Sequence, residues 1–201
     1  MFKNLKIAFL LTVYASGLIY CIQKDHKTEA AITIAIQPFT GIPEKDVVYV
    51  EQKIKSFYPK VVVLPKINLP KQAYYKTRNR YRADSILVFL NQSKAHDFVF
   101  IGLTSKDISA TKGINNDFGV LGLGYCPGKA CVASTFRLEK NTRQEQLFKV
   151  AIHELGHTQG LPHCKQKHCF MRDAEGKNPT NEEKEFCKDC KKHLRGKGWK
   201  L

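Results

Sequence analysis

The sequence predicts an α/β fold in which one compact domain contains a mixed, twisted sheet packed by helices. Short apolar runs rich in β-branched residues alternate with segments of helical spacing, and 43% of the 201 residues are hydrophobic. The chain contains no internal repeat and no low-complexity tract. This length and composition are typical of a single globular domain with a hydrophobic core, and they exclude disordered, collagen-like and coiled-coil chains.

Residues 1–21 are predicted to form a signal peptide or a membrane anchor. Lys3 and Lys6 precede an apolar stretch from Ile7 to Ile22, and the small residues Ala15–Gly17 fit a cleavage site. The stretch has 16 residues, fewer than the roughly 20 that span a bilayer comfortably. Lipid modification at Cys21 and a buried first helix are the alternatives. We therefore expect an exported or cell-envelope protein, with any membrane association through this N-terminus.

The domain is predicted to begin with a strand, a helix and a second strand. Ala30–Ile36 is a short apolar run with β-branched residues, which is typical of a buried strand. Pro43 suits the first turn of a helix, and apolar residues recur at helical spacing from Val47 to Phe57. Pro59 ends this helix, and Val61–Leu64 predicts the second strand.

One further helix and three further strands are expected in the middle of the chain. Asp84–Leu90 predicts the helix, with Tyr74–Arg82 as its lead-in, and Asp97–Leu103 predicts the next strand. Three glycines interrupt the apolar run Phe118–Tyr125, which indicates an irregular edge strand or the close approach of a ligand. Val132–Leu138 predicts the last strand.

The residues that carry chemistry begin on a helix after position 142. Thr142 and Glu145 match a capping box, which predicts the start of the helix. His153 and His157 lie four residues apart on it, so both imidazoles leave the same face and can bind one metal ion. Glu154 projects about 100° away, a position that suits a general base acting on metal-bound water.

Gly160 and His163 complete a predicted zinc site. Gly160 can adopt a positive φ, end the helix and turn the chain, so that His163 becomes a third ligand. Three histidines leave one zinc position open for water, as catalysis requires. A purely structural zinc, or surface histidines on an ordinary helix, are the alternatives.

Four cysteines follow this motif and predict a second zinc site. They are arranged as one wide pair and one C-x-x-C pair, Cys164 with Cys169 and Cys187 with Cys190. Four thiolates bind zinc tetrahedrally and leave no open position, so this ion would be structural. It would hold together a segment that contains little apolar material. Two disulfides are the alternative, since an exported protein meets oxidising conditions.

The combined motif resembles the archaemetzincins, a family of the metzincin zinc peptidases. The resemblance rests on the string H-E-x-x-H-x-x-G-x-x-H from His153 to His163, followed by Cys164-x4-Cys169-x-Met171 and Cys187-x-x-Cys190. It implies a compact metzincin-like domain with His153, His157 and His163 on a catalytic zinc. It also implies Glu154 as the general base, Met171 as the floor of the site, and the four cysteines on a second zinc. A substrate would lie extended along an edge strand, for which 118–125 is our candidate.

The predicted organisation is therefore a catalytic domain at residues 28–201. Residues 28–160 form an upper subdomain with the active-site helix, and 161–201 form a lower, irregular, Cys-rich subdomain stapled by zinc. The predicted function is hydrolysis of peptide bonds by attack of zinc-bound water with two Zn²⁺ per chain. Its partner is a peptide or protein substrate, and we expect a monomer.

Two other functions remain open at this point. The first is a catalytically inactive metzincin-like protein that binds zinc and peptides. The second is nucleic-acid binding through the basic residues of 164–200, in a chain whose net charge is +15. An export signal disfavours the second, so no nucleic-acid partner is expected, and the basic tail Lys188–Lys200 is predicted to be solvated. Cys126 and Cys131 enclose a Pro-Gly turn, which predicts a small disulfide loop, with two free thiols as the alternative.

Overall fold

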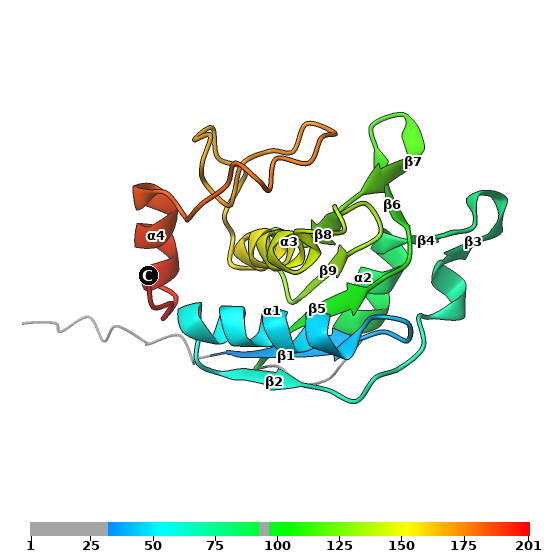
Figure 1. Ribbon diagram of the computed structural model, residues 1–201, viewed down its shortest axis with the longest axis horizontal. Helices are drawn as coiled ribbons and strands as arrows, with labels where there is room; N and C mark the ends of the chain where they lie inside the picture. Colours follow the sequence, from blue (N-terminus) through cyan, green and yellow to red (C-terminus); the bar gives the residue numbers. More distant parts are fainter. Residues whose placement is uncertain (1–31, 93–96) are drawn as a thin grey trace, which may run out of the picture.

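The computed structural model describes residues 32–92 and 97–201 (Figure 1). The predicted export segment, residues 1–21, lies outside these ranges. Within them, no helix is both long and apolar enough to cross a bilayer.

A five-stranded sheet forms the centre of the molecule. Its strands lie in the order β2 (Val61–Val63), β1 (Thr33–Pro38), β5 (Phe98–Thr104), β9 (Ala130–Ser134) and β8 (Gly122–Gly124). All neighbours are parallel except β8, which runs antiparallel to β9. The strand β8 is thus one edge of a mixed sheet, as the fold class predicts.

Helices cover both faces of this sheet. The helices α1 (Glu44–Phe57) and α3 (Arg143–Thr158) pack against each other on one face, and α2 (Ala83–Asn91) packs on the other (Figure 1). Along β9, Cys131 and Ala133 belong to the core under α1 and α3, whereas Ala130 and Val132 belong to the core under α2. Burial on both faces explains why these strands are continuous apolar runs.

A second sheet contradicts one expectation from the sequence. It consists of β3 (Tyr74–Tyr75), β4 (Arg80–Arg82), β6 (Ile108–Lys112) and β7 (Asn115–Val120), with short 3₁₀ turns at Lys71–Ala73 and Lys76–Arg78. The predicted helical lead-in at 74–82 is therefore wrong. The tyrosines pair across a hairpin instead, with the rings of Tyr74 and Tyr81 5.3 Å apart between centroids.

Two strand boundaries and one helix cap also differ from the prediction. The run 118–125 is divided at Leu121, so its first part belongs to β7 and its second part is the edge strand β8. The strand predicted to reach Leu138 ends at Ser134, because the chain then turns and Leu138 N–H donates to the carbonyl of Thr135. The helix α3 does begin after Thr142, but without a side-chain cap.

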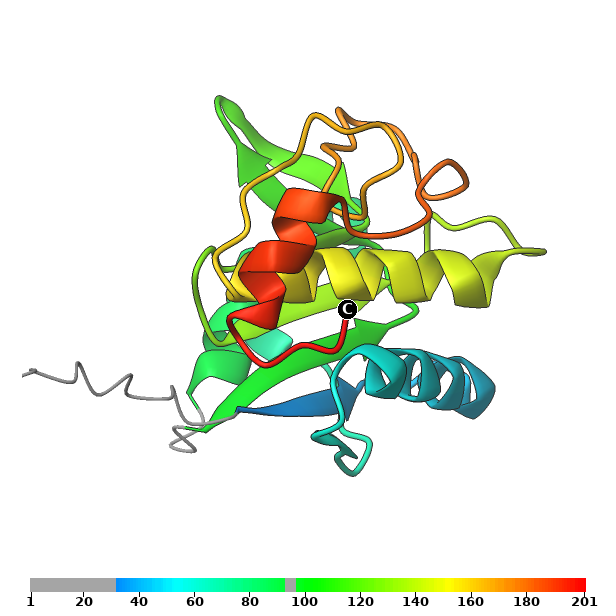
Figure 2. The same ribbon diagram turned by 90° about the vertical axis from the view of Figure 1, so that its left-hand side faces the viewer.

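The C-terminal segment returns to the same core. After Gly160 the chain passes along α3 in irregular loops and ends in α4 (Lys188–Arg195), which lies beside α3 (Figure 2). Trp199 is buried against Tyr58, and Lys200 N–H donates to the carbonyl of Phe57. The tail predicted to be solvated is therefore docked by its apolar residues. The boundary between residues 160 and 161 stays a prediction, since one hydrophobic cluster includes residues from both sides of it.

Candidate active site

The structure gathers the three predicted histidine ligands at the C-terminal end of α3. The Nε2 atoms of His153 and His157 lie 3.0 Å apart, and the ring of His163 lies 5.4 and 4.9 Å from theirs between centroids. One ligand atom from each of the three residues lies within 4.8 Å of the others. Ligands at zinc–nitrogen distances of about 2.0–2.1 Å in a tetrahedron are separated by about 3.3 Å. The three side chains therefore fit a shared zinc ion.

A glycine turn brings His163 back to the helix. Gly160 has a φ of +91°, which glycine adopts without strain. Its N–H donates to the carbonyl of His157, and Leu161 N–H donates to the carbonyl of Gly156. These bonds close the end of α3 as the sequence predicts.

Each imidazole is oriented by an oxygen atom on its Nδ1 side. His153 Nδ1 lies 2.6 Å from the carbonyl oxygen of Phe170, and His157 Nδ1 lies 2.7 Å from that of Leu161. His163 Nδ1 lies 3.3 Å from the carboxylate of Asp173. The hydrogen bonds of His153 and His157 place the proton on Nδ1 and leave Nε2 as the metal-binding atom of these two residues.

Burial keeps the first two histidines in the form that binds metal. It lowers the pKa of His153 to about 3, with a further contribution from His157, and it also lowers the pKa of His157. Both rings are therefore neutral at neutral pH, as a zinc ligand must be.

Glu154 is held between α3 and the glycines of the edge strand. It is 7% exposed, and a Cβ atom at Gly122 would lie 2.6 Å from its Oε1. A Cβ atom at Gly124 would lie 3.2 Å from its Oε2. The glycines in this run therefore do allow a close approach, and the group that approaches is this carboxylate. Burial raises the pKa of Glu154 to about 8, so its carboxyl can exchange a proton near neutral pH.

We predict that Gly122→Ala lowers kcat by about 10²-fold, because the added methyl group displaces the Glu154 carboxylate from its position. Steady-state kinetics, zinc content and thermal unfolding of the variant would be measured together. The expected pattern is a large loss of kcat with zinc still bound. An unchanged kcat would show that the position of Glu154 does not depend on the space at Gly122.

Met171 packs against α3 at Gly156, within the histidine motif. It is fully buried, and a Cβ atom at Gly156 would lie 2.4 Å from its sulfur. The glycine of the histidine motif thus leaves room for Met171 to pack directly against α3. Its role as the floor of the site stays a prediction.

The four predicted cysteine ligands also come together. Cys164 Sγ and Cys187 Sγ lie 3.7 Å apart, Cys169 Sγ and Cys190 Sγ lie 3.8 Å apart, and all four lie within 4.8 Å of one another. A disulfide needs about 2.05 Å, whereas four sulfurs at 2.3 Å from one zinc are about 3.8 Å apart. The geometry excludes disulfides between these residues and fits a zinc ion.

Burial opposes the charged form of two of these thiols. It raises the pKa of Cys169 to about 11 and raises that of Cys190 well above its ordinary value. Both would be neutral thiols without a cation beside them, and bound zinc would hold them as thiolates.

The predicted disulfide between Cys126 and Cys131 is not formed. Cys131 is buried in the core under α3, while Cys126 is exposed and its thiol donates to the carbonyl of Leu161. The two side chains therefore point to different parts of the structure. His168 also stays outside the cysteine cluster, since its Nδ1 bonds with the carbonyl of Glu182.

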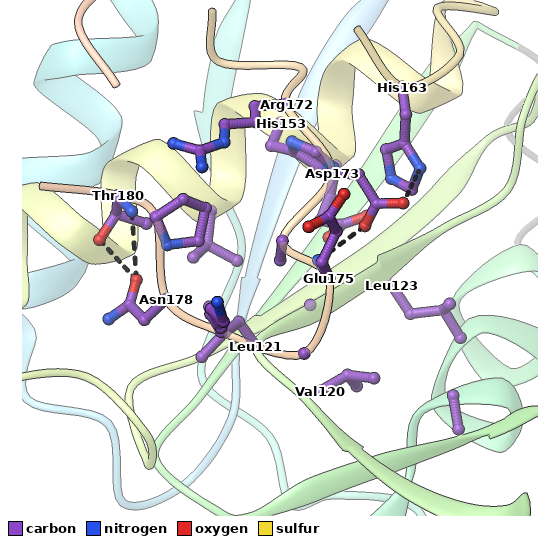
Figure 3. Close-up of a pocket in the computed structure, with 18 of the residues that line it drawn as sticks. Val120, Leu121, Leu123, His153, His163, Arg172, Asp173, Glu175, Asn178 and Thr180 are labelled. Carbon is purple, nitrogen blue, oxygen red and sulfur yellow. Dashed lines mark hydrogen bonds and ion pairs between the residues drawn. The ribbon is translucent and has the colours of Figure 1, made fainter. Parts of the chain in front are cut away.

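A cleft of about 580 Å³ connects the histidines to the edge strand and to the loop after Met171 (Figure 3). One wall is formed by β7 and β8, and the other by residues 172–180. Sequence reasoning missed Asp173 in this loop. Its only sequence signal is its position two residues after Met171, and nothing in the motif pairs it with His163.

Comparisons with known proteins find similar sequences over most of the chain. A family model described as peptidase family M54 matches residues 22–196. Archaemetzincin from Archaeoglobus fulgidus is 34% identical over 166 residues, which cover 81% of this chain and 98% of the relative. Archaemetzincin from Methanopyrus kandleri is 34% identical over 150 residues, covering 70% and 81%.

Solved structures give the same result. The crystal structure of archaemetzincin from Methanopyrus kandleri superposes with a TM-score of 0.70 at 29% identity, covering 83% of this chain and 96% of that one. Archaemetzincin from Archaeoglobus fulgidus, crystallised with malonate, also gives a TM-score of 0.70 at 29% identity, covering 81% and 99%.

Proposed function

The chain belongs to peptidase family M54 and is a zinc metallopeptidase, and from this premise we propose how its own residues carry out peptide hydrolysis. His153, His157 and His163 hold the catalytic zinc, and Glu154 is the general base. The observation that carries the proposal is the gathering of three imidazoles beside a buried carboxylate in one cleft.

The metal and this carboxylate have different roles in the catalytic step. Zinc in such a site acts as a Lewis acid, which polarises a carbonyl and lowers the pKa of water to about 7. Glu154 accepts the proton of the attacking water and then donates it to the leaving amine. The raised pKa of its carboxyl suits both transfers, and the glycines of β8 fix its position.

The edge strand β8 orients the substrate. It pairs with β9 on one side and, among the described residues, has no strand partner on the other. Gly122, Leu123 and Gly124 also line the cleft. An extended peptide that hydrogen-bonds to this free edge would present its backbone to the histidines and Glu154.

The four cysteines hold a second, structural zinc. The sulfur separations fit a tetrahedral ion, and the cluster ties the loop at Cys164 and Cys169 to the start of α4 at Cys187 and Cys190. Four thiolates leave no open position, so this ion takes no part in hydrolysis.

We expect purified protein to contain two zinc ions per chain and to cleave members of a mixed peptide library. Elemental analysis would count the zinc, and mass spectrometry would identify the cleaved bonds. Two zinc ions without any cleavage would contradict the proposal and would indicate a peptide-binding protein. Salt-sensitive retention on DNA without cleavage would contradict it in favour of nucleic-acid binding.

A further inference from the structure

The cleft extends past His153 toward the middle of α3. There it is lined by Lys149 and Val150 of the helix and by Asn178, Thr180 and Glu183. Figure 3 labels Asn178 and Thr180 among these residues. Lys149 precedes His153 by four residues, so the two side chains leave the same face of the helix. A peptide bound at the histidines therefore reaches this part of the cleft with a residue close to the scissile bond.

The Lys149 ammonium is already engaged by the opposite wall. Its Nζ donates to the carbonyl oxygens of Thr180 and Glu183, at 2.8 and 2.7 Å. Four other cations line the cleft, Lys112, Arg137, Arg172 and Lys177, and the two arginines have carboxylate partners of their own. Arg172 bonds with Glu182, and Arg137 bonds with Asp107 further along.

Glu183 differs from these groups because its carboxylate has no partner. The residue is 3% exposed and lines the cleft. Within the described residues its carboxylate makes no hydrogen bond or ion pair, and its oxygens are not among the fully enclosed polar atoms, so they reach the solvent of the cleft. Its burial raises the pKa of its carboxyl to about 7, despite the more distant charges of Lys149 and Arg172. A carboxylate that lines a cleft and has no protein cation bonded to it can accept charge-assisted hydrogen bonds from a cationic group of a ligand.

We propose that Glu183 selects peptides that carry a cationic group near the scissile bond, by accepting hydrogen bonds from an ammonium or a guanidinium. Lysine and arginine side chains supply such a group, and so does the free α-amine of a peptide. The inference rests on the proposed peptidase function and names a specificity residue for it. An uncharged analogue cannot make this charge-assisted hydrogen bond, so it is disfavoured as a substrate.

The test compares peptides that differ in one charge. Each peptide cleaved in the library is resynthesised with lysine, arginine or uncharged norleucine at one position at a time, with a free or an acetylated N-terminus. We expect that, at one position of the peptide, wild-type protein cleaves the cationic form with a kcat/KM at least about 10-fold higher than that of the matching uncharged form. If acetylation of the N-terminus removes the preference for the cationic peptide, the recognised cation is the α-amine. If the preference for lysine or arginine over norleucine survives acetylation, the recognised cation is the side chain.

The variant Glu183→Gln keeps the shape of the side chain and removes its charge. We expect it to lower the cationic-to-neutral ratio of kcat/KM by at least about 10-fold. Glu185→Gln is the matched control, because Glu185 is exposed, pairs with Lys191 and does not line the cleft. It is expected to keep the wild-type ratio, and thermal unfolding of both variants would show whether each is folded.

The outcomes separate this inference from the proposed function. If peptides are cleaved but the cationic-to-neutral ratio of kcat/KM is near one, or if Glu183→Gln leaves this ratio unchanged, the role of Glu183 is overturned and the peptidase proposal still stands. If no peptide is cleaved, binding decides instead. Fluorescence anisotropy of labelled lysine, arginine and norleucine peptides to zinc-loaded protein, with and without Glu183→Gln, is expected to show the same charge preference, and equal binding would overturn the inference.

Discussion

Replacing Glu154 by glutamine is expected to lower kcat/KM by at least about 10²-fold while the zinc content stays at two ions per chain. Glutamine fills the same space between α3 and β8 but cannot accept the proton of the attacking water. The variant would be assayed on the peptides that the wild-type protein cleaves, with elemental analysis of the same samples.

A second glutamate on α3 provides the control. Glu145 lies near the start of the helix, where its carboxylate bonds with Tyr49 and pairs with Lys53, away from the cleft. Glu145→Gln is expected to retain hydrolysis. Wild-type turnover in Glu154→Gln, with zinc confirmed, would rule out Glu154 as the general base.

Replacing Cys190 by serine is expected to reduce the zinc content from two ions to one and to destabilise the protein by several kcal/mol. Zinc binding at four thiolates is coupled to folding and is worth about 10–16 kcal/mol in small zinc domains. Cys190 is buried, and its loss releases the loop at Cys169 from α4. At about 2–4 °C per kcal/mol for a chain of this size, a fall of about 10 °C in the melting temperature is expected.

Cys126→Ser is the matched control for this variant. Cys126 is exposed and lies outside the four-cysteine cluster, so its replacement is expected to leave the zinc count at two. If Cys190→Ser also retained two zinc ions and its melting temperature, the structural zinc would have to be abandoned.

The sequence predicts the central sheet better than the second one, for a physical reason. The strands β1, β5 and β9 are buried on both faces, so each is a continuous apolar run that stands out in the sequence. The second sheet is short and polar. Ion pairs contribute to holding it, such as those of Arg80 with Asp107 and Asp117, and ion pairs leave no hydrophobic periodicity.

The helix cap shows how tertiary contacts override a local pattern. Thr142 and Glu145 have the spacing of a capping box, and α3 does begin after Thr142. Glu145 nevertheless turns to Tyr49 and Lys53 of α1. The pattern therefore locates the start of the helix correctly but assigns the wrong partner to the carboxylate of Glu145.

In the candidate site, too, residues on a regular element are predictable from the sequence, whereas residues on irregular segments are not. Fixed spacing on a helix and a glycine turn suffice to predict that His153, His157 and His163 meet. Asp173 and Glu183 come from an irregular segment without periodicity, so only the folded chain places them in the cleft. The cysteine spacing left zinc and disulfides open, and the distances between sulfur atoms decide between them.

Anomalous diffraction at the zinc edge, from crystals of the zinc-loaded protein, tests the central claim most directly. We expect one peak at about 2.0–2.1 Å from the Nε2 atoms of His153, His157 and His163, with a water molecule as the fourth ligand, and a second peak among the four cysteines. No peak at the histidines, or a protein side chain in the fourth position of that ion, would contradict the account.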